Sequence, residues 1–109
     1  MSNPESPTTY QDLTNYSTNN PAKLLVLKFE ATWCAPCRAI KPFIDYLKTE
    51  YPNVDFHQYD IENESTLDIT EQFEIAKVPC FIYFKNGVVC DTIIGTNKEN
   101  IENAINEHL

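Results

Sequence analysis

Cys34 and Cys37 are the residues of this chain whose type and spacing most clearly indicate chemistry. They follow a nearly continuous aliphatic run, 24–29, and precede apolar residues at helical spacing, so both thiols belong to the turn where a buried strand becomes a helix. Backbone N–H groups at a helix start stabilise a thiolate, which favours Cys34 as a nucleophile and Cys37 as the resolving thiol. The short spacer, with Pro36 in the first helical turn, lets the pair alternate between dithiol and disulfide.

Two other uses of the cysteines fit less well. Half a zinc site needs two further ligands, and Cys80 and Cys90 lie on the two strands of one predicted hairpin, so we expect no metal. Two structural disulfides are not needed in a chain that is 42% hydrophobic and shows no export signal. We therefore expect reactive thiols in a reducing compartment, the cytoplasm.

The elements that must position these thiols alternate between strand and helix. The apolar spacing after Cys34 predicts a helix over 35–50 with a kink at Pro42, and Ser65-Thr66-Leu67-Asp68 has the form of a capping box that opens a further helix. Asn86-Gly87 between two apolar runs is a strong hairpin signal. The order predicts an α/β fold with a mixed four-stranded sheet between helices, and a fifth edge strand is disfavoured by prolines. The expected strands are 24–29, a segment through Val54, Phe56 and Tyr59, 80–84 and 88–94; the expected helices are 9–18, 35–50, 65–73 and one capped by 96–99.

Length and charge limit what the chain can be. Its 109 residues are enough for one compact core. Residues 1–21 are expected to form a loose segment with one weak helix, and residues 22–109 the folded domain. Sixteen acidic against eight basic residues give a formal net charge of −8, which argues against nucleic acid and anionic membranes as partners. We also expect neither a signal peptide nor a membrane span, because the apolar runs are short.

From Lys23 to the end, the sequence resembles the thioredoxin family. Several motifs carry the resemblance, not the cysteine pair alone: Ala31-Thr32-Trp33-Cys34-Ala35-Pro36-Cys37, with Ala35 where the family usually has Gly, Ile40-Lys41-Pro42-Phe43, Val78-Pro79, Phe84-Lys85-Asn86-Gly87, and Gly95. The resemblance implies a thioredoxin-like fold with a mixed sheet of four to five strands. It also implies a protein-disulfide reductase of cellular redox homeostasis and electron transport, needing no cofactor.

The resemblance further implies how this protein would meet its partners. A shallow groove would bind an extended segment of a disulfide-containing protein, which pairs with the backbone of Val78 beside a cis bond to Pro79. A thioredoxin reductase or another dithiol donor would then restore the dithiol, and we expect a monomer. The residues implied for the groove are Trp33, Ala35, Pro36, Val78, Pro79, Gly95 and Thr96.

Lys28 is the most informative departure from the family pattern, which has a buried acid at this position, thought to relay a proton to or from the resolving thiol. An ammonium roughly 6 Å from Cys37, at an effective dielectric of about 20, would favour the Cys37 thiolate by about 3 kcal/mol, or around two pKa units. A neutral, buried Lys28 could instead act as a base. The alternatives are that Lys28 reaches past the strand end or pairs with Glu30 on the same strand face. Lys28 is therefore a candidate catalytic residue.

Cys80 directly follows the expected cis-proline, where the family commonly has Thr, and is a candidate accessory thiol. Its alternative role is a small packing residue at the start of a strand. Cys90, on the edge hairpin, is interpreted as a packing residue, and His57 and the tyrosines as residues on strand and helix surfaces.

Two function classes follow from this sequence. The first is a disulfide reductase in which Cys34 attacks and Cys37 resolves. The second is a protein-binding module with the same fold and slow or vestigial redox turnover, a consequence of Lys28. The presence of both cysteines favours the first.

Overall fold

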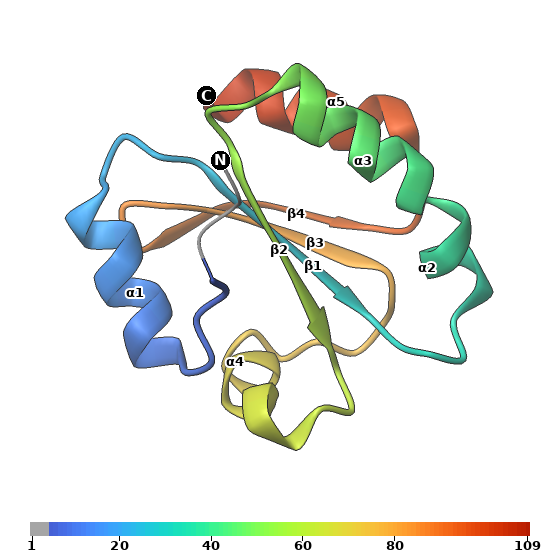
Figure 1. The fold of residues 1–109 in the computed structure, drawn as a ribbon, viewed down its shortest axis with the longest axis horizontal. Coiled ribbons are helices and arrows are strands. Elements are labelled where there is room, and N and C mark those ends of the chain that lie inside the picture. The colour runs from blue at the N-terminus through green and yellow to red at the C-terminus, as the bar shows by residue number, and fades with distance from the viewer. Residues whose placement is uncertain (1–4) are drawn as a thin grey trace.

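The computed structural model describes residues 5–109, in which a four-stranded mixed sheet lies between helices (Figure 1). The strand order is β2-β1-β3-β4. The central strand β1 (Leu25–Glu30) is parallel to β2 (Asp55–Asp60) and antiparallel to β3 (Cys80–Lys85), and β4 (Val88–Ile94) forms the far edge. The predicted α/β fold class is confirmed. The first four residues of the expected loose segment lie outside the described residues.

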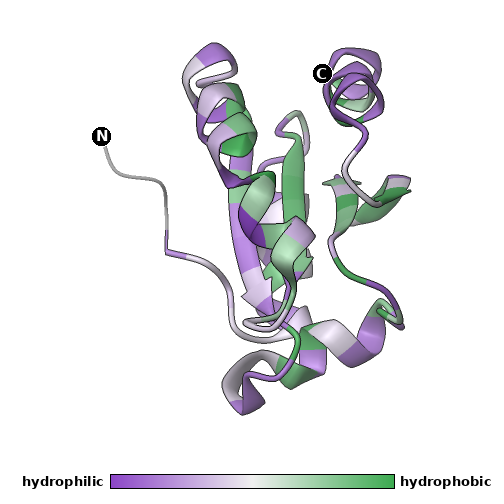
Figure 2. Cartoon of the chain, turned by 90° about the vertical axis from the view of Figure 1, so that its right-hand side faces the viewer, coloured by the Kyte–Doolittle hydropathy of each residue, from purple (hydrophilic) through white to green (hydrophobic). Residues whose placement is uncertain are grey.

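Helices cover both faces of the sheet (Figure 1). The helices α3 (Lys41–Glu50) and α5 (Lys98–His108) lie on one face, and α1 (Tyr10–Asn19) and α4 (Leu67–Gln72) on the other. Because strand residues alternate, Val26 packs into the core beneath α3 and α5, and Leu27 into the core beneath α1 and α4. Figure 2 shows hydrophobic residues gathered between these layers. Among residues 5–109, no helix has both the length and the apolar content to cross a membrane.

Helix α1 is fixed to the rest of the molecule at both ends and in its middle. Leu13 is fully buried in the second core, and the N–H of Tyr10 donates to the Asp68 carboxylate at 2.6 Å. Near the other end, the Ser17 hydroxyl accepts a hydrogen bond from the N–H of Gly87 at 2.9 Å. The helix predicted from a weak pattern is therefore held by tertiary contacts.

The hairpin between β3 and β4 turns at Asn86 and Gly87, which have φ values of 51° and 75°. Both central residues of a type I′ turn require positive φ, and this is why Asn-Gly marks such turns. A Cβ at Gly87 would also meet the Thr18 Cγ2 atom at 2.9 Å. The predicted hairpin is confirmed.

The helix predicted over 35–50 is divided into α2 (Ala35–Ala39) and α3, with Ile40 between them. Pro42 explains the division because it has no N–H to donate to the carbonyl of Arg38, four residues earlier. The expected kink is thus a break between two helices.

The predicted capping box at residues 65–68 is wrong. The Asn63 side chain accepts a hydrogen bond from the N–H of Ser65 at 3.0 Å and begins a short 3-10 turn, η1 (Glu64–Thr66). Thr66 then precedes α4 without a side-chain cap. Asp68 does not reach back to Thr66 or Ser65 because its carboxylate is engaged by α1.

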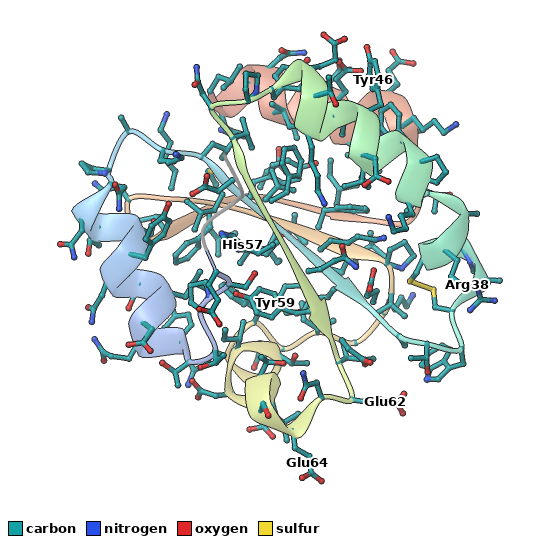
Figure 3. The ribbon with its side chains drawn as sticks, viewed as in Figure 1. Arg38, Tyr46, His57, Tyr59, Glu62 and Glu64 are labelled. Carbon is teal, nitrogen blue, oxygen red and sulfur yellow. A yellow bond between two sulfur atoms is a disulfide. The ribbon has the colours of Figure 1, made fainter. Side chains whose placement is uncertain are left out.

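The interpretation of His57 and the tyrosines as surface residues is wrong for several of them. His57 is 3% exposed, and Tyr59 and Tyr83 are also buried. The Ser6 hydroxyl bonds the His57 Nδ1 atom at 2.8 Å, and the Tyr59 hydroxyl donates to the Pro7 carbonyl at 2.8 Å. The segment before α1 therefore covers these β2 side chains, which lie side by side in Figure 3.

Candidate active site

Cys34 and Cys37 lie just beyond the end of β1, at the start of α2, and are joined in a disulfide. Their Cα atoms are 5.3 Å apart, and Figure 3 shows the bond with Arg38 beside it. Cys34 is the N-cap of α2, so the turn after a buried strand brings the two sulfurs together. Sites of open α/β sheets commonly lie at such strand ends.

A backbone amide polarises the Cys34 sulfur. The N–H of Cys37 donates to Cys34 Sγ at 3.2 Å. Since α2 has only five residues, this hydrogen bond, more than a long helix dipole, favours a thiolate at Cys34. The Cys34 and Cys37 residues are 4% and 2% exposed, so a partner must approach along the rim formed by their neighbours.

The structure brings the cis-proline loop to the cysteines. Val78 packs against the cluster of Ala31, Cys34 and Cys37. The peptide bond from Val78 to Pro79 is cis, and the carbonyl of Pro79 accepts a hydrogen bond from the N–H of Gly95 at 2.9 Å. The remaining implied groove residues, Trp33, Ala35, Pro36 and Thr96, are exposed.

Trp33 projects from the molecule beside Cys34. It is 65% exposed, and its indole N–H donates to the Glu62 carboxylate at 3.1 Å. The sequence interpretation did not include Glu62, which follows β2 and is close to Trp33 only in the folded chain.

Lys28 is buried beneath the cysteine turn. Its residue is 4% exposed, and its ammonium donates to the Cys37 carbonyl at 3.0 Å. The same ammonium pairs with the Glu30 carboxylate at 3.0 Å, so the alternative in which Lys28 and Glu30 form an ion pair is confirmed. Lys28 therefore links the resolving cysteine to an acid on its own strand.

Two further residues complete this arrangement and were not assigned a site role from the sequence. Glu30 also accepts a hydrogen bond from the Gln58 amide at 2.8 Å. Gln58 is opposite Lys28 in the register of β1 and β2. Glu30 could be linked to Lys28 from the sequence, because residues two apart on a strand share one face. Gln58 could be recognised only once the register between β1 and β2 was known.

Cys80 and Cys90 are free thiols, of which Cys80 is buried and Cys90 is partly exposed. Cys80 is 4% exposed, and burial raises the pKa of its thiol. Cys90 is half-buried, donates to the Tyr83 carbonyl at 3.3 Å, and has its pKa raised chiefly by burial. Both shifts reduce the thiolate fraction at neutral pH.

Within residues 5–109, one group of acidic and histidine side chains lies close enough together to share a metal ion. It is far from the cysteine pair in the sequence. Potential ligand atoms of Asp91, Glu107 and His108 lie within 4.8 Å of one another. The contact between His108 Nε2 and the Asp91 carboxylate, at 3.3 Å, already accounts for this cluster.

Comparison with known proteins agrees with this geometry. A family model described as Thioredoxin matches residues 7–107. Human thioredoxin is 38% identical over 103 residues, which cover 94% of this chain and 93% of the human protein. Sheep thioredoxin is 41% identical over 85 residues, 78% of this chain and 79% of that protein.

Solved structures show the same fold. Fasciola hepatica thioredoxin superposes with a TM-score of 0.84 at 29% identity, covering 94% of this chain and 96% of that one. Oxidised mitochondrial thioredoxin 3 from Saccharomyces cerevisiae gives a TM-score of 0.80 at 32% identity over 93% of this chain and 92% of that one. With the family model spanning nearly the whole chain and both cysteines in place, this protein belongs to the thioredoxin family and is a thiol-disulfide oxidoreductase.

Proposed function

We propose that this protein reduces protein disulfides with Cys34 as the nucleophile and Cys37 as the resolving thiol. The observation that carries the assignment is the hydrogen bond from the Cys37 N–H to Cys34 Sγ, because it favours negative charge on Cys34. In the reduced protein, Cys34 attacks a substrate disulfide and forms a mixed disulfide. Cys37 then attacks Cys34, the second substrate sulfur leaves, and the pair becomes the disulfide seen here.

Reduction of insulin, followed by turbidity, tests these roles. Cys34→Ser should abolish turnover, and Cys37→Ser should accumulate a covalent adduct through Cys34. Cys90→Ser is the matched control, because Cys90 is a half-buried thiol on another strand. Full turnover by Cys34→Ser would contradict the assignment. A redox midpoint in Trp33 fluorescence without turnover would favour the binding-module alternative.

The substrate segment is proposed to lie along Trp33, Val78 and Gly95 and to pair with the backbone of Val78. Support comes from the packing of Val78 against the cysteine cluster and from the Gly95 to Pro79 hydrogen bond, which holds the two loops together. Val78→Asp should raise KM for insulin. Val88→Asp, at a 62% exposed position on the hairpin, should leave KM unchanged. Equal effects of the two variants would contradict this groove.

We further infer that a thioredoxin reductase or another dithiol donor restores the pair, and that the protein acts as a monomer in the cytoplasm. A donor is needed because the disulfide between Cys34 and Cys37 must be reduced before the next turnover, and the presence of two free cysteines, Cys80 and Cys90, suits a reducing compartment. Coupled oxidation of a nicotinamide cofactor by added reductase, size-exclusion chromatography and cell fractionation test the three points in turn.

A further inference from the structure

The cleft behind the resolving cysteine is lined by several charged groups. Its volume is about 370 Å³. Three of these groups are engaged elsewhere: Arg38 donates to a backbone carbonyl at 2.6 Å, Lys41 pairs with Asp45 at 3.1 Å, and Asp60 accepts a backbone N–H at 2.9 Å. The side chains that line the cleft include Lys28, Glu30, Cys37, Arg38, Lys41, Gln58 and Asp60.

Lys28 and Glu30 are the charged groups of this cleft whose contacts lead to Cys37. The Lys28 ammonium bonds both the Cys37 carbonyl and the Glu30 carboxylate, each at 3.0 Å. The Gln58 amide holds the other Glu30 oxygen at 2.8 Å. The Glu30 side chain is 25% exposed, whereas the Lys28 side chain is 5% exposed, so Glu30 connects a buried network to solvent.

The resolving step needs a group that can take a proton inside the molecule. Cys37 is 2% exposed, and its thiol must be deprotonated before the sulfur can attack Cys34. Lys28, paired as an ammonium, has no lone pair to accept that proton. Each Glu30 oxygen has one hydrogen-bond donor among the described residues and keeps capacity for another.

We propose that Glu30 accepts the proton released by Cys37 when the mixed disulfide is resolved, with Lys28 and Gln58 as positioning residues. This rests on the proposed function. The Cys37 proton passes to the Glu30 carboxylate through water in the cleft. The Cys37 sulfur forms a bond to Cys34 Sγ, and the bond from Cys34 to the substrate sulfur breaks. The substrate leaves as a thiolate, reduced by two electrons, while the cysteine pair is oxidised, and Glu30 returns its proton to solvent.

Glu30→Gln tests the proposal because its two possible effects change the rate of the resolving step in opposite directions. One effect is the loss of the negative charge, and the other is the loss of the proton acceptor. Without the Glu30 charge, the Lys28 ammonium is uncompensated, so the pKa of Cys37 should fall by about one and a half units. If Glu30 acted only through its charge, this lower pKa would leave the rate of the resolving step unchanged or increase it. Loss of the acceptor should instead slow resolution at least about tenfold.

The assay mixes reduced protein with 5,5′-dithiobis(2-nitrobenzoic acid) in a Cys90→Ser background. One thionitrobenzoate leaves when Cys34 attacks and a second when Cys37 resolves, so the second phase reports resolution. Asp60→Asn is the matched control, a carboxylate lost from the same cleft but bound to a backbone N–H. It should leave the second phase unchanged, and Glu30→Gln should leave the first phase unchanged.

Each outcome decides the matter. A slower second phase in Glu30→Gln, together with a lower Cys37 pKa, supports the proposal. An unchanged or faster second phase overturns it. If Glu30→Gln does not fold, Glu30→Asp keeps a carboxylate on a shorter side chain, and a second phase as fast as in the parent protein overturns the proposal. If the parent protein shows no second phase, the proposed function itself fails.

Discussion

Replacing Lys28 by Met is the change that most directly tests how the buried charge affects the resolving thiol. Met has a similar length and can keep the packing of a residue that is 4% exposed. It removes the ammonium that bonds the Cys37 carbonyl and leaves Glu30 with Gln58 as its partner. We expect the pKa of Cys37 to rise, because a stabilising charge is lost and the Glu30 carboxylate is no longer compensated.

The size of the shift follows from Coulomb's law. An ammonium about 6 Å from the sulfur stabilises the thiolate by about 3 kcal/mol at an effective dielectric of about 20. A carboxylate about 8 Å away opposes this by about 2 kcal/mol. The intact pair should therefore lower the Cys37 pKa by less than about one unit, and Lys28→Met should raise it by about two units relative to wild type.

The pKa of Cys37 can be followed in the reduced protein by NMR of labelled cysteine side chains. Lys41→Met is the control, because Lys41 lines the same cleft but is paired with Asp45 at 3.1 Å. It should shift the Cys37 pKa far less. An unchanged Cys37 pKa in Lys28→Met, with an intact thermal unfolding transition, would refute the electrostatic reasoning. A shift in Lys41→Met as large as that in Lys28→Met would refute it as well.

Three further predictions concern residues outside this network. Leu13→Ala should destabilise the protein by about 2–5 kcal/mol in urea unfolding, because Leu13 is fully buried, and a negligible loss would contradict a structural role for α1. Burial lowers the pKa of His57 below its usual 6.5, so the unfolded chain takes up a proton first as the pH falls. The wild type should therefore lose stability as the pH falls through the usual histidine pKa and below it, and His57→Leu should lose less; equal pH slopes would contradict this reasoning. Cys80 should react with iodoacetamide much more slowly in the folded reduced protein than Cys34, as mass spectrometry can measure, and Cys80→Ser should keep full insulin turnover.

Local patterns were enough to predict most of the fold and the position of the cysteine pair. The aliphatic run before Cys34, the apolar spacing after it and Asn86-Gly87 each reflect interactions within a few residues or a simple strand period. Such local patterns can be recognised in a single sequence. Pro42 predicted that the helix would be disturbed near Ile40. The sequence did not show whether the helix would bend or divide into two.

Features that depend on pairing between distant segments could not be predicted in the same way. The Asp68 carboxylate accepts the N–H of Tyr10 in α1 and does not cap its own helix, because the tertiary fold brings Tyr10 to it. His57 looked like a surface residue because the alternation of β2 does not reveal that Ser6 and Pro7 cover that face. Gln58 joins the site through the strand register, which the sequence left undetermined.

The division at Ile40 separates the short helix that carries Cys37 from the long helix behind it. Ile40 is 2% exposed and lies in the interior, whereas four of the five residues of α2 are exposed and Cys37 is buried. We expect opening and closing of the disulfide between Cys34 and Cys37 to change mainly α2. We therefore expect the core beneath α3 to keep its packing through each catalytic cycle.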